Sequence, residues 1–149
     1  MGIVEDIKQI KSFRSEFHKV TVNIIYSSSW ILGHVKEFVG KEDITPQQYN
    51  ILRILRGSVL PLSTLQIRER MLDKMSDTSR LVERLIKKEL VEKETSHIDK
   101  RLVDVTISKK GLDLLQRLDE KSEELDQIVN KLTTEEAGIL NSLLDKMRN

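Results

Sequence analysis

The sequence predicts a mainly α-helical fold with one small β-hairpin, an α+β arrangement in a chain of 149 residues. Apolar residues recur every three or four positions through most of the chain, which is the period of an amphipathic helix. Capping boxes, the Ser/Thr-x-x-Glu/Gln patterns that begin helices, occur at Thr45, Ser63 and Thr133. Between residues 90 and 107 the apolar period changes to two, as in paired strands.

The first part of the chain predicts two helices. Residues 3–39 are expected to form one long helix that stops at Gly40. The capping box at Thr45, with Pro46 at the first helical position, begins a second helix that ends near Gly57. The apolar stripe of the long helix contains Phe13, Phe17, Val20, Ile24, Ile31, Val35 and Phe38.

Two short helices and a hairpin follow. Ser63 begins the first helix and residues 75–89 form the second, so the pair is predicted to be a helix-turn-helix. Two alternating runs, residues 90–95 and 102–107, predict the strands of a β-hairpin with a polar turn between them.

Two further helices complete the chain. Ser108 caps a helix expected to run to about Leu132 with an apolar seam, and Thr133 begins the last helix. The apolar stripes of residues 3–20 and 111–149 exceed what one small helix-turn-helix unit can cover. Packing against a second copy and packing of the two ends into a helical hairpin both fit this pattern.

Charge and composition restrict the function. Residues 53–110 contain 14 basic and nine acidic residues, a net charge of +5, whereas residues 111–149 have a net charge of −4. A localised positive charge is typical of polyanion binding, although it also fits an ordinary solvated surface. The absence of cysteine excludes disulfides and thiolate metal sites. Without a signal-peptide layout or a long apolar run, a cytoplasmic protein that does not span a membrane is expected.

Enzyme motifs are missing from the sequence. It contains no phosphate-binding glycine loop, no dinucleotide fingerprint and no HExxH pattern. The three histidines, His18, His34 and His97, are too dispersed for metal-ligand spacing. We therefore expect no catalytic residues, no metal site and no cofactor.

With this order of elements, the chain resembles the MarR family of bacterial winged-helix regulators, from about Phe13 to Met147. Four segments carry the resemblance: Ile44-Thr45-Pro46-Gln47-Gln48-Tyr49; Ser79-Arg80-Leu81-Val82-Glu83-Arg84-Leu85; Asp99-Lys100-Arg101 followed by Val103 and Val105; and Ser108-Lys109-Lys110-Gly111.

The resemblance implies a winged helix-turn-helix DNA-binding domain at residues 45–110. Residues 1–44 and 111–149 would be the dimerisation segments of a homodimer. The implied function is a sequence-specific regulator of transcription, a repressor by family habit, that binds a pseudo-palindromic operator in double-stranded DNA. The rival function is a winged-helix protein-interaction module that does not bind DNA.

The resemblance also places helix 75–89 in the major groove and the hairpin tip in the minor groove. Arg101 would enter the minor groove, oriented by Asp99. The alternative is that these are ordinary surface charges, with Ser76 acting only as an N-cap. The expected DNA contacts are Ser76, Thr78, Ser79, Arg80, Arg84, Lys100 and Arg101.

Two positions depart from the family pattern, and one helix face suggests an effector. Glu89 stands where the family often has Gly, and Glu is not expected to adopt a left-handed cap conformation. Asp77 places a negative charge where phosphate is expected. Tyr26, Trp30 and His34, spaced by four residues, could line a pocket for a small aromatic or anionic effector, or could instead be buried core.

Overall fold

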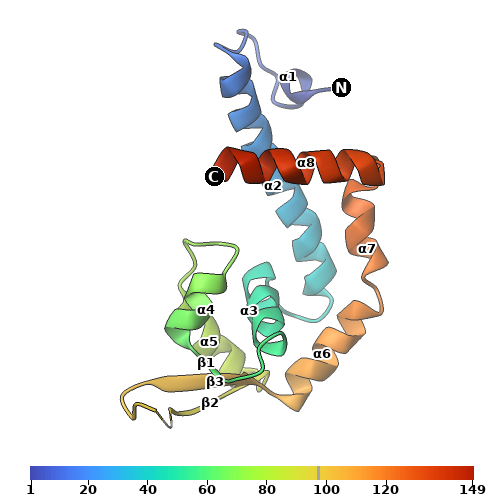
Figure 1. Cartoon of the computed structure of the whole chain (residues 1–149). Coiled ribbons are helices and arrows are strands. Elements are labelled where there is room, and N and C mark those ends of the chain that lie inside the picture. Colours follow the sequence, from blue (N-terminus) through green and yellow to red (C-terminus); the bar gives the residue numbers. More distant parts are fainter. Residues whose placement is uncertain (97) are drawn as a thin grey trace.

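The structure is a computed structural model that describes residues 1–96 and 98–149; His97, in the predicted hairpin turn, lies outside the described residues. It confirms the mainly helical fold with a small antiparallel sheet (Figure 1). The elements are α1 (Ile3–Asp6), α2 (Glu16–Gly40), α3 (Pro46–Arg56), β1 (Leu62–Ser63), α4 (Thr64–Arg70), α5 (Thr78–Lys87), β2 (Val91–Thr95), β3 (Val103–Ile107), α6 (Lys109–Asp119), α7 (Glu123–Asp126), the 3₁₀ helix η1 (Gln127–Val129) and α8 (Thr134–Arg148).

The three predicted capping boxes are confirmed. At Thr45, the side-chain Oγ1 accepts from the backbone N–H of Gln48 at 3.1 Å, and the Gln48 side chain accepts from the Thr45 N–H at 3.0 Å. The same reciprocal pairs begin α4 at Ser63 and α8 at Thr133. These local bonds satisfy N–H groups that a helix start leaves unpaired, which explains why the sequence located these starts correctly.

Two predicted helices are interrupted, so their predicted ranges are wrong. The helix expected over residues 3–39 is α1 and α2, because Ser15 caps α2 by accepting from the His18 N–H at 3.1 Å. The helix expected over residues 108–132 breaks after α6. There the N–H groups of Lys121 and Ser122 bond three residues back, to Leu118 and Asp119, instead of four. An apolar period continues through both breaks and therefore does not reveal them.

The sheet has three strands rather than the predicted two, in the order β1-β3-β2. Strands β2 and β3 form the predicted hairpin, with Val91 opposite Ile107 and Thr95 opposite Val103. Strand β1 pairs Leu62 with Val105. At two residues it is too short to show an alternating pattern in the sequence.

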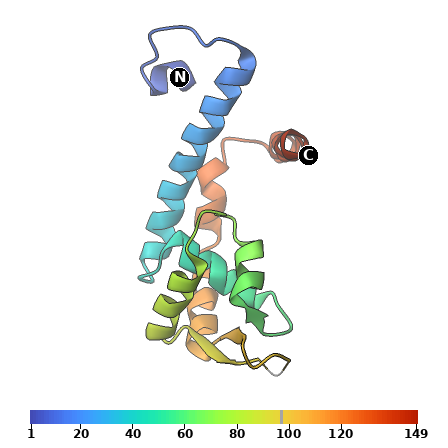
Figure 2. The same cartoon turned by 90° about the vertical axis from the view of Figure 1, so that its left-hand side faces the viewer.

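One hydrophobic core lies at the end of the molecule that carries the sheet (Figures 1 and 2). We call this part, from the end of α2 through α6, the lobe. Its core includes Phe38 and Val39 of α2 as well as Leu114, Leu115 and Leu118 of α6. The core therefore extends beyond residues 45–110 on both sides, and α2 and α6 are anchored in it.

The opposite end of the molecule leaves apolar side chains uncovered. Helix α8 has no buried residue and lies away from the lobe; it overlaps α2 in the view of Figure 1 but stands apart from it in Figure 2. The exposed apolar side chains of these two helices are Phe17, Val20, Ile25, Tyr26, Trp30, Ile31 and Leu32 on α2, and Ile139, Leu140, Leu143 and Met147 on α8.

The turn between α2 and α3 is tied to three other elements by three consecutive residues. Lys41 forms an ion pair with Glu124 of α7 at 2.9 Å, and Asp43 forms one with Lys88, the C-cap of α5, at 3.3 Å. Between them, Glu42 accepts two bonds from the Arg117 guanidinium of α6, at 3.0 and 2.9 Å. These bonds hold the pKa of the Glu42 carboxyl below its usual value.

The expectation that Glu89 avoids the left-handed conformation is wrong, since its φ is 60°. The Leu90 N–H bonds to the Leu85 carbonyl at 3.0 Å and the Glu89 N–H to the Ile86 carbonyl at 2.9 Å, which is a Schellman cap. The Glu89 carbonyl also accepts from the Ser108 hydroxyl at 2.7 Å. The surroundings thus hold a strained residue in a position that glycine would occupy without strain.

Replacing Glu89 with Gly is expected to stabilise the protein by about 1 kcal/mol, because it removes the left-handed penalty. The exposed ion pair of Glu89 with Lys110 contributes little. Urea unfolding measures the gain. Glu120→Gly is the control, since Glu120 caps α6 with a φ of −62° and should gain nothing. An equal gain in both variants would contradict the explanation.

Candidate nucleic-acid interface

Helix α5, the second helix of the helix-turn-helix, begins later than predicted. Its N-cap is Asp77, whose carboxylate accepts from the Arg80 N–H at 3.1 Å. The alternative that Ser76 is the N-cap is therefore wrong. A negative charge at a helix N-terminus is favourable, so Asp77 has a local structural role in addition to any effect on phosphate.

The start of α5 is less exposed than predicted. Ser79, Arg80 and Arg84 are exposed, but Thr78 is only 3% exposed, so its expected exposure is wrong. Ser76 is half-buried. Neither the Ser76 nor the Thr78 hydroxyl finds a hydrogen-bond partner among the described residues. Thr78 lies on the face of α5 that also buries Val82 and Leu85, a placement that its polar side chain does not signal in the sequence.

The two arginines on the exposed face of α5 have no ion-pair partner within residues 1–96 and 98–149. Glu83, which lies between Arg80 and Arg84, pairs instead with Lys93 of β2 at 3.0 Å. Both guanidiniums can therefore meet an anion without first breaking an internal contact.

A shallow groove that the sequence did not predict lies beside the start of α5. It is lined by Thr64, Leu65 and Arg68 of α4 and by residues 76–79. Arg68 is exposed and makes no ion pair with any other described residue. In the sequence, only the position of Arg68 in the first helix of the helix-turn-helix indicates that it could lie at this surface.

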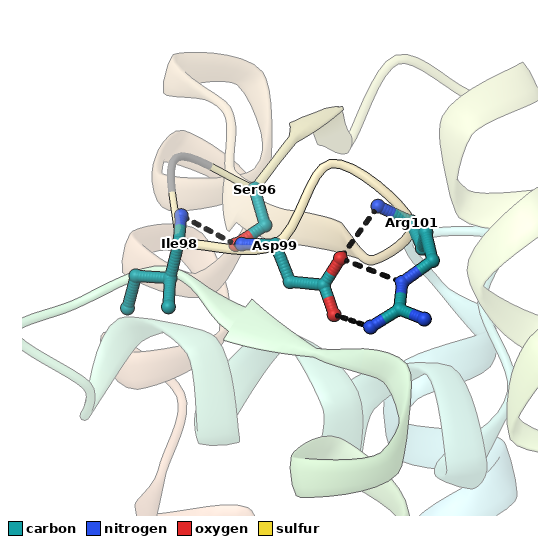
Figure 3. A network of polar contacts seen from close by, with 4 residues as sticks. All are labelled: Ser96, Ile98, Asp99 and Arg101. Atoms are coloured by element: carbon teal, nitrogen blue, oxygen red, sulfur yellow. Dashed lines mark hydrogen bonds and ion pairs between the residues drawn. The ribbon is translucent and has the colours of Figure 1, made fainter.

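At the hairpin tip, Asp99 pairs with Arg101, as the sequence predicts (Figure 3). Oδ1 accepts from the Arg101 backbone N–H at 3.0 Å and from Nε at 3.1 Å, and Oδ2 accepts from Nη2 at 3.0 Å. These bonds lower the pKa of Asp99 and raise that of Arg101. A guanidinium has five N–H donors, so three remain available while the side chain stays 90% exposed. The neighbouring Lys100 is also exposed.

The backbone of the tip is held by further hydrogen bonds. Ser96 is buried, and its hydroxyl oxygen accepts from the N–H groups of Ile98 at 3.2 Å and Asp99 at 3.4 Å (Figure 3). The Ser96 N–H bonds to the Leu102 carbonyl at 3.0 Å, and the Leu102 N–H to the Asp99 carbonyl at 2.9 Å. These bonds connect Ser96 with Ile98, Asp99 and Leu102.

The aromatic stripe on α2 is exposed and is not part of the core of the single chain. Tyr26, Trp30 and His34 are all open to solvent in the single chain. Trp30 and His34 stack edge to face with ring centroids 4.8 Å apart.

Among the described residues, no helix has the length and hydropathy to cross a membrane.

The sequence of the chain is similar to that of a known transcriptional regulator. No protein-family model matches the chain. The HTH-type transcriptional regulator MhqR of Bacillus subtilis (strain 168) is 26% identical over 120 residues, which are 78% of this chain and 81% of that protein.

Solved structures match over most of the chain. A putative MarR-like transcription regulator from Bacillus cereus ATCC 10987 gives a TM-score of 0.80 at 24% identity, covering 89% of this chain and 96% of that one. A mutant MarR from E. coli complexed with operator DNA gives 0.81 at 20% identity, covering 92% and 99%. Bordetella bronchiseptica BpsR, whose DNA binding is regulated by 6-hydroxynicotinic acid, gives 0.76 at 20% identity, covering 85% and 90%. None of these proteins is named as an enzyme, and the chain has the fold of the MarR-like transcription regulators.

Proposed function

We propose that this chain is a sequence-specific regulator of transcription that binds double-stranded DNA as a homodimer. The observation that carries the proposal is the pair of exposed guanidiniums on α5, Arg80 and Arg84, which no described residue neutralises. In a MarR-like fold α5 is the helix that enters the major groove, where an arginine can bond to the O6 and N7 atoms of guanine. Ser76, Thr78 and Ser79 belong to the same interface, with Thr78 acting through the packing of the helix start.

Three cations complete the proposed DNA surface. Arg101 at the hairpin tip enters the minor groove, where the negative potential attracts arginine, and Lys100 contacts phosphate. Arg68, on the other side of the groove from the start of α5, contacts a phosphate of the same duplex. The net charge of +5 on residues 53–110 supplies a long-range attraction for the polyanion.

The proposed dimer follows from the apolar side chains that α2 and α8 leave uncovered. Residues 1–44 and 111–149 provide its interface, and residues 45–110 carry the DNA contacts. A two-fold axis would place two copies of α5 about one DNA turn apart, ~34 Å, on a pseudo-palindromic operator. Binding over a promoter would repress transcription.

An effector site is the second part of the proposal. Tyr26, Trp30 and His34 present a small aromatic surface on α2, and a second subunit could close it into a pocket. A small aromatic or anionic effector bound there would favour one spacing of the two lobes and shift DNA affinity. The regulation of BpsR by 6-hydroxynicotinic acid supports this class of effector.

Selection of bound duplexes from a random DNA pool tests the proposed function. We expect enrichment of a pseudo-palindrome with half-sites about one helical turn apart. Affinity should fall by ~10³ or more between about 50 and 200 mM salt if six or more phosphates are neutralised. Recovery of no sequence, together with no salt-dependent binding, would overturn the proposal and favour a protein-interaction module.

Arg101→Ala is expected to weaken binding to the selected duplex by about 1–3 kcal/mol and to reduce the salt slope by about one. Fluorescence anisotropy at several salt concentrations measures both quantities. Arg56→Ala is the matched control, because Arg56 of α3 also pairs with a carboxylate, Asp119, and lies outside both the proposed DNA contacts and the proposed dimer segments. Equal losses in the two variants would show that the tip has no special role.

A further inference from the structure

The hairpin tip presents an apolar side chain beside its fixed arginine. Ile98 is 98% exposed, although its backbone N–H is bonded to the buried Ser96. In the view of Figure 3, the side chains of Ile98, Asp99 and Arg101 extend to the same side of the loop. One face of the tip therefore offers an aliphatic group and a guanidinium together.

Because the Ile98 side chain is exposed, it does not contribute to the hydrophobic stabilisation of the folded chain. A single exposed apolar residue on a protein surface needs no explanation by itself. Ile98 differs because its N–H and that of Asp99 are bonded to the buried Ser96, and because Asp99, Lys100 and Arg101 together carry a net positive charge. An aliphatic group beside a net positive charge has the chemistry of a minor-groove ligand, since such proteins combine basic residues with apolar wedges.

We propose that Ile98 is a specificity-determining residue that contacts the floor of the minor groove and disfavours G·C pairs there. The inference rests on the proposed DNA-binding function. The amino group at N2 of guanine projects into the minor groove, whereas A·T pairs present only acceptors. An aliphatic side chain cannot accept a bond from that amino group, so covering it leaves a buried donor unpaired. Arg101 supplies attraction to the groove, and Ile98 supplies the discrimination.

Inosine provides a direct test of this contact. An I·C pair has the major groove of G·C but lacks the guanine N2 amino group, so the two pairs differ only in the minor groove. The probes are two versions of the duplex selected from the random pool, in which the base pairs beneath the two hairpin tips are I·C in one and G·C in the other. We expect the wild-type protein to bind the I·C duplex roughly fivefold more tightly than the G·C duplex.

Ile98→Ser is expected to bring this ratio close to one, because a serine hydroxyl can accept from the amino group. Its salt slope should equal that of the wild-type protein, since no charge is lost. Ile10→Ser is the matched control. Ile10 is also 98% exposed, lies in the connection between α1 and α2 at the other end of the molecule, and should leave the ratio unchanged (Figure 1).

Each outcome decides between the proposals. Failure of the wild-type protein to bind the unmodified selected duplex would overturn the proposed DNA-binding function. Binding of both duplexes with equal affinity would leave DNA binding intact and overturn the role of Ile98. The same conclusion would follow if Ile98→Ser kept the wild-type ratio, or if Ile10→Ser lost it too. Thermal unfolding checks that both variants are folded. We expect both to be folded, because the two replaced side chains are almost fully exposed.

Discussion

Gly111→Ala is expected to destabilise the protein by about 3 kcal/mol, because a Cβ atom at this position has no space. It would lie 2.3 Å from the carbonyl oxygen of Leu90 and 2.7 Å from Cγ1 of Ile107. The Leu90 oxygen cannot simply withdraw, since it accepts from the Ser108 N–H at 3.0 Å. The substitution would therefore push α6 away from the base of the hairpin. Urea unfolding measures the loss.

Gly33→Ala is the control for this variant. Gly33 lies within α2, and nothing is within 4 Å of the position its Cβ would occupy. Alanine is the better helix former, so this variant should gain up to about 1 kcal/mol. A Gly111→Ala protein as stable as the wild type would show that the contact between α6 and the hairpin is looser than the structure indicates.

Leu143→Asp is expected to dissociate the proposed dimer and, with it, to abolish binding to the selected duplex. Leu143 of α8 is 58% exposed in the single chain, and the proposal buries it against a second copy. A buried carboxylate without a partner costs at least about 3 kcal/mol, which corresponds to a dimer more than ~10²-fold weaker. Light scattering at micromolar concentration gives the oligomeric state, and anisotropy gives the DNA affinity.

Leu60→Asp is the matched control for Leu143→Asp. Leu60 lies in the connection between α3 and β1 and is more exposed, at 72%, so a carboxylate there stays in water and the dimer should persist. A wild-type monomer would contradict the proposed assembly. So would a Leu143→Asp protein that remains dimeric, because α8 would then lie outside the interface.

The elements that the sequence located correctly depend on local chemistry. A capping box uses residues three positions apart, and a hairpin alternates over five, so both can be recognised without knowledge of the rest of the fold. The same holds at the tip, where Asp99 and Arg101 are two residues apart and their pairing was expected. The capping box at Thr45 and the Asp99–Arg101 tip also lie in two of the four segments that carry the resemblance to the MarR family.

The features that the sequence missed depend on contacts between distant segments. Glu89 adopts a left-handed conformation in a Schellman cap, and Ser108, 19 residues later, supports it by bonding to its carbonyl. Thr78 is buried because α5 packs against α3 and α4, which overrides its polar character. The short strand β1 exists only because β3 is beside it. In each case the propensity of the residue favours a different outcome from the one that packing imposes.

The turn formed by Lys41, Glu42 and Asp43 has a consequence for engineering. Each of its ion pairs is exposed at one or both ends and contributes little to the free energy of folding. The three adjacent residues of the turn pair with three different elements, so inserting or deleting one residue in the turn would break all three pairings at once. A chimera that transplants the lobe onto other terminal helices should therefore carry Lys88, Arg117 and Glu124 together with an unaltered turn.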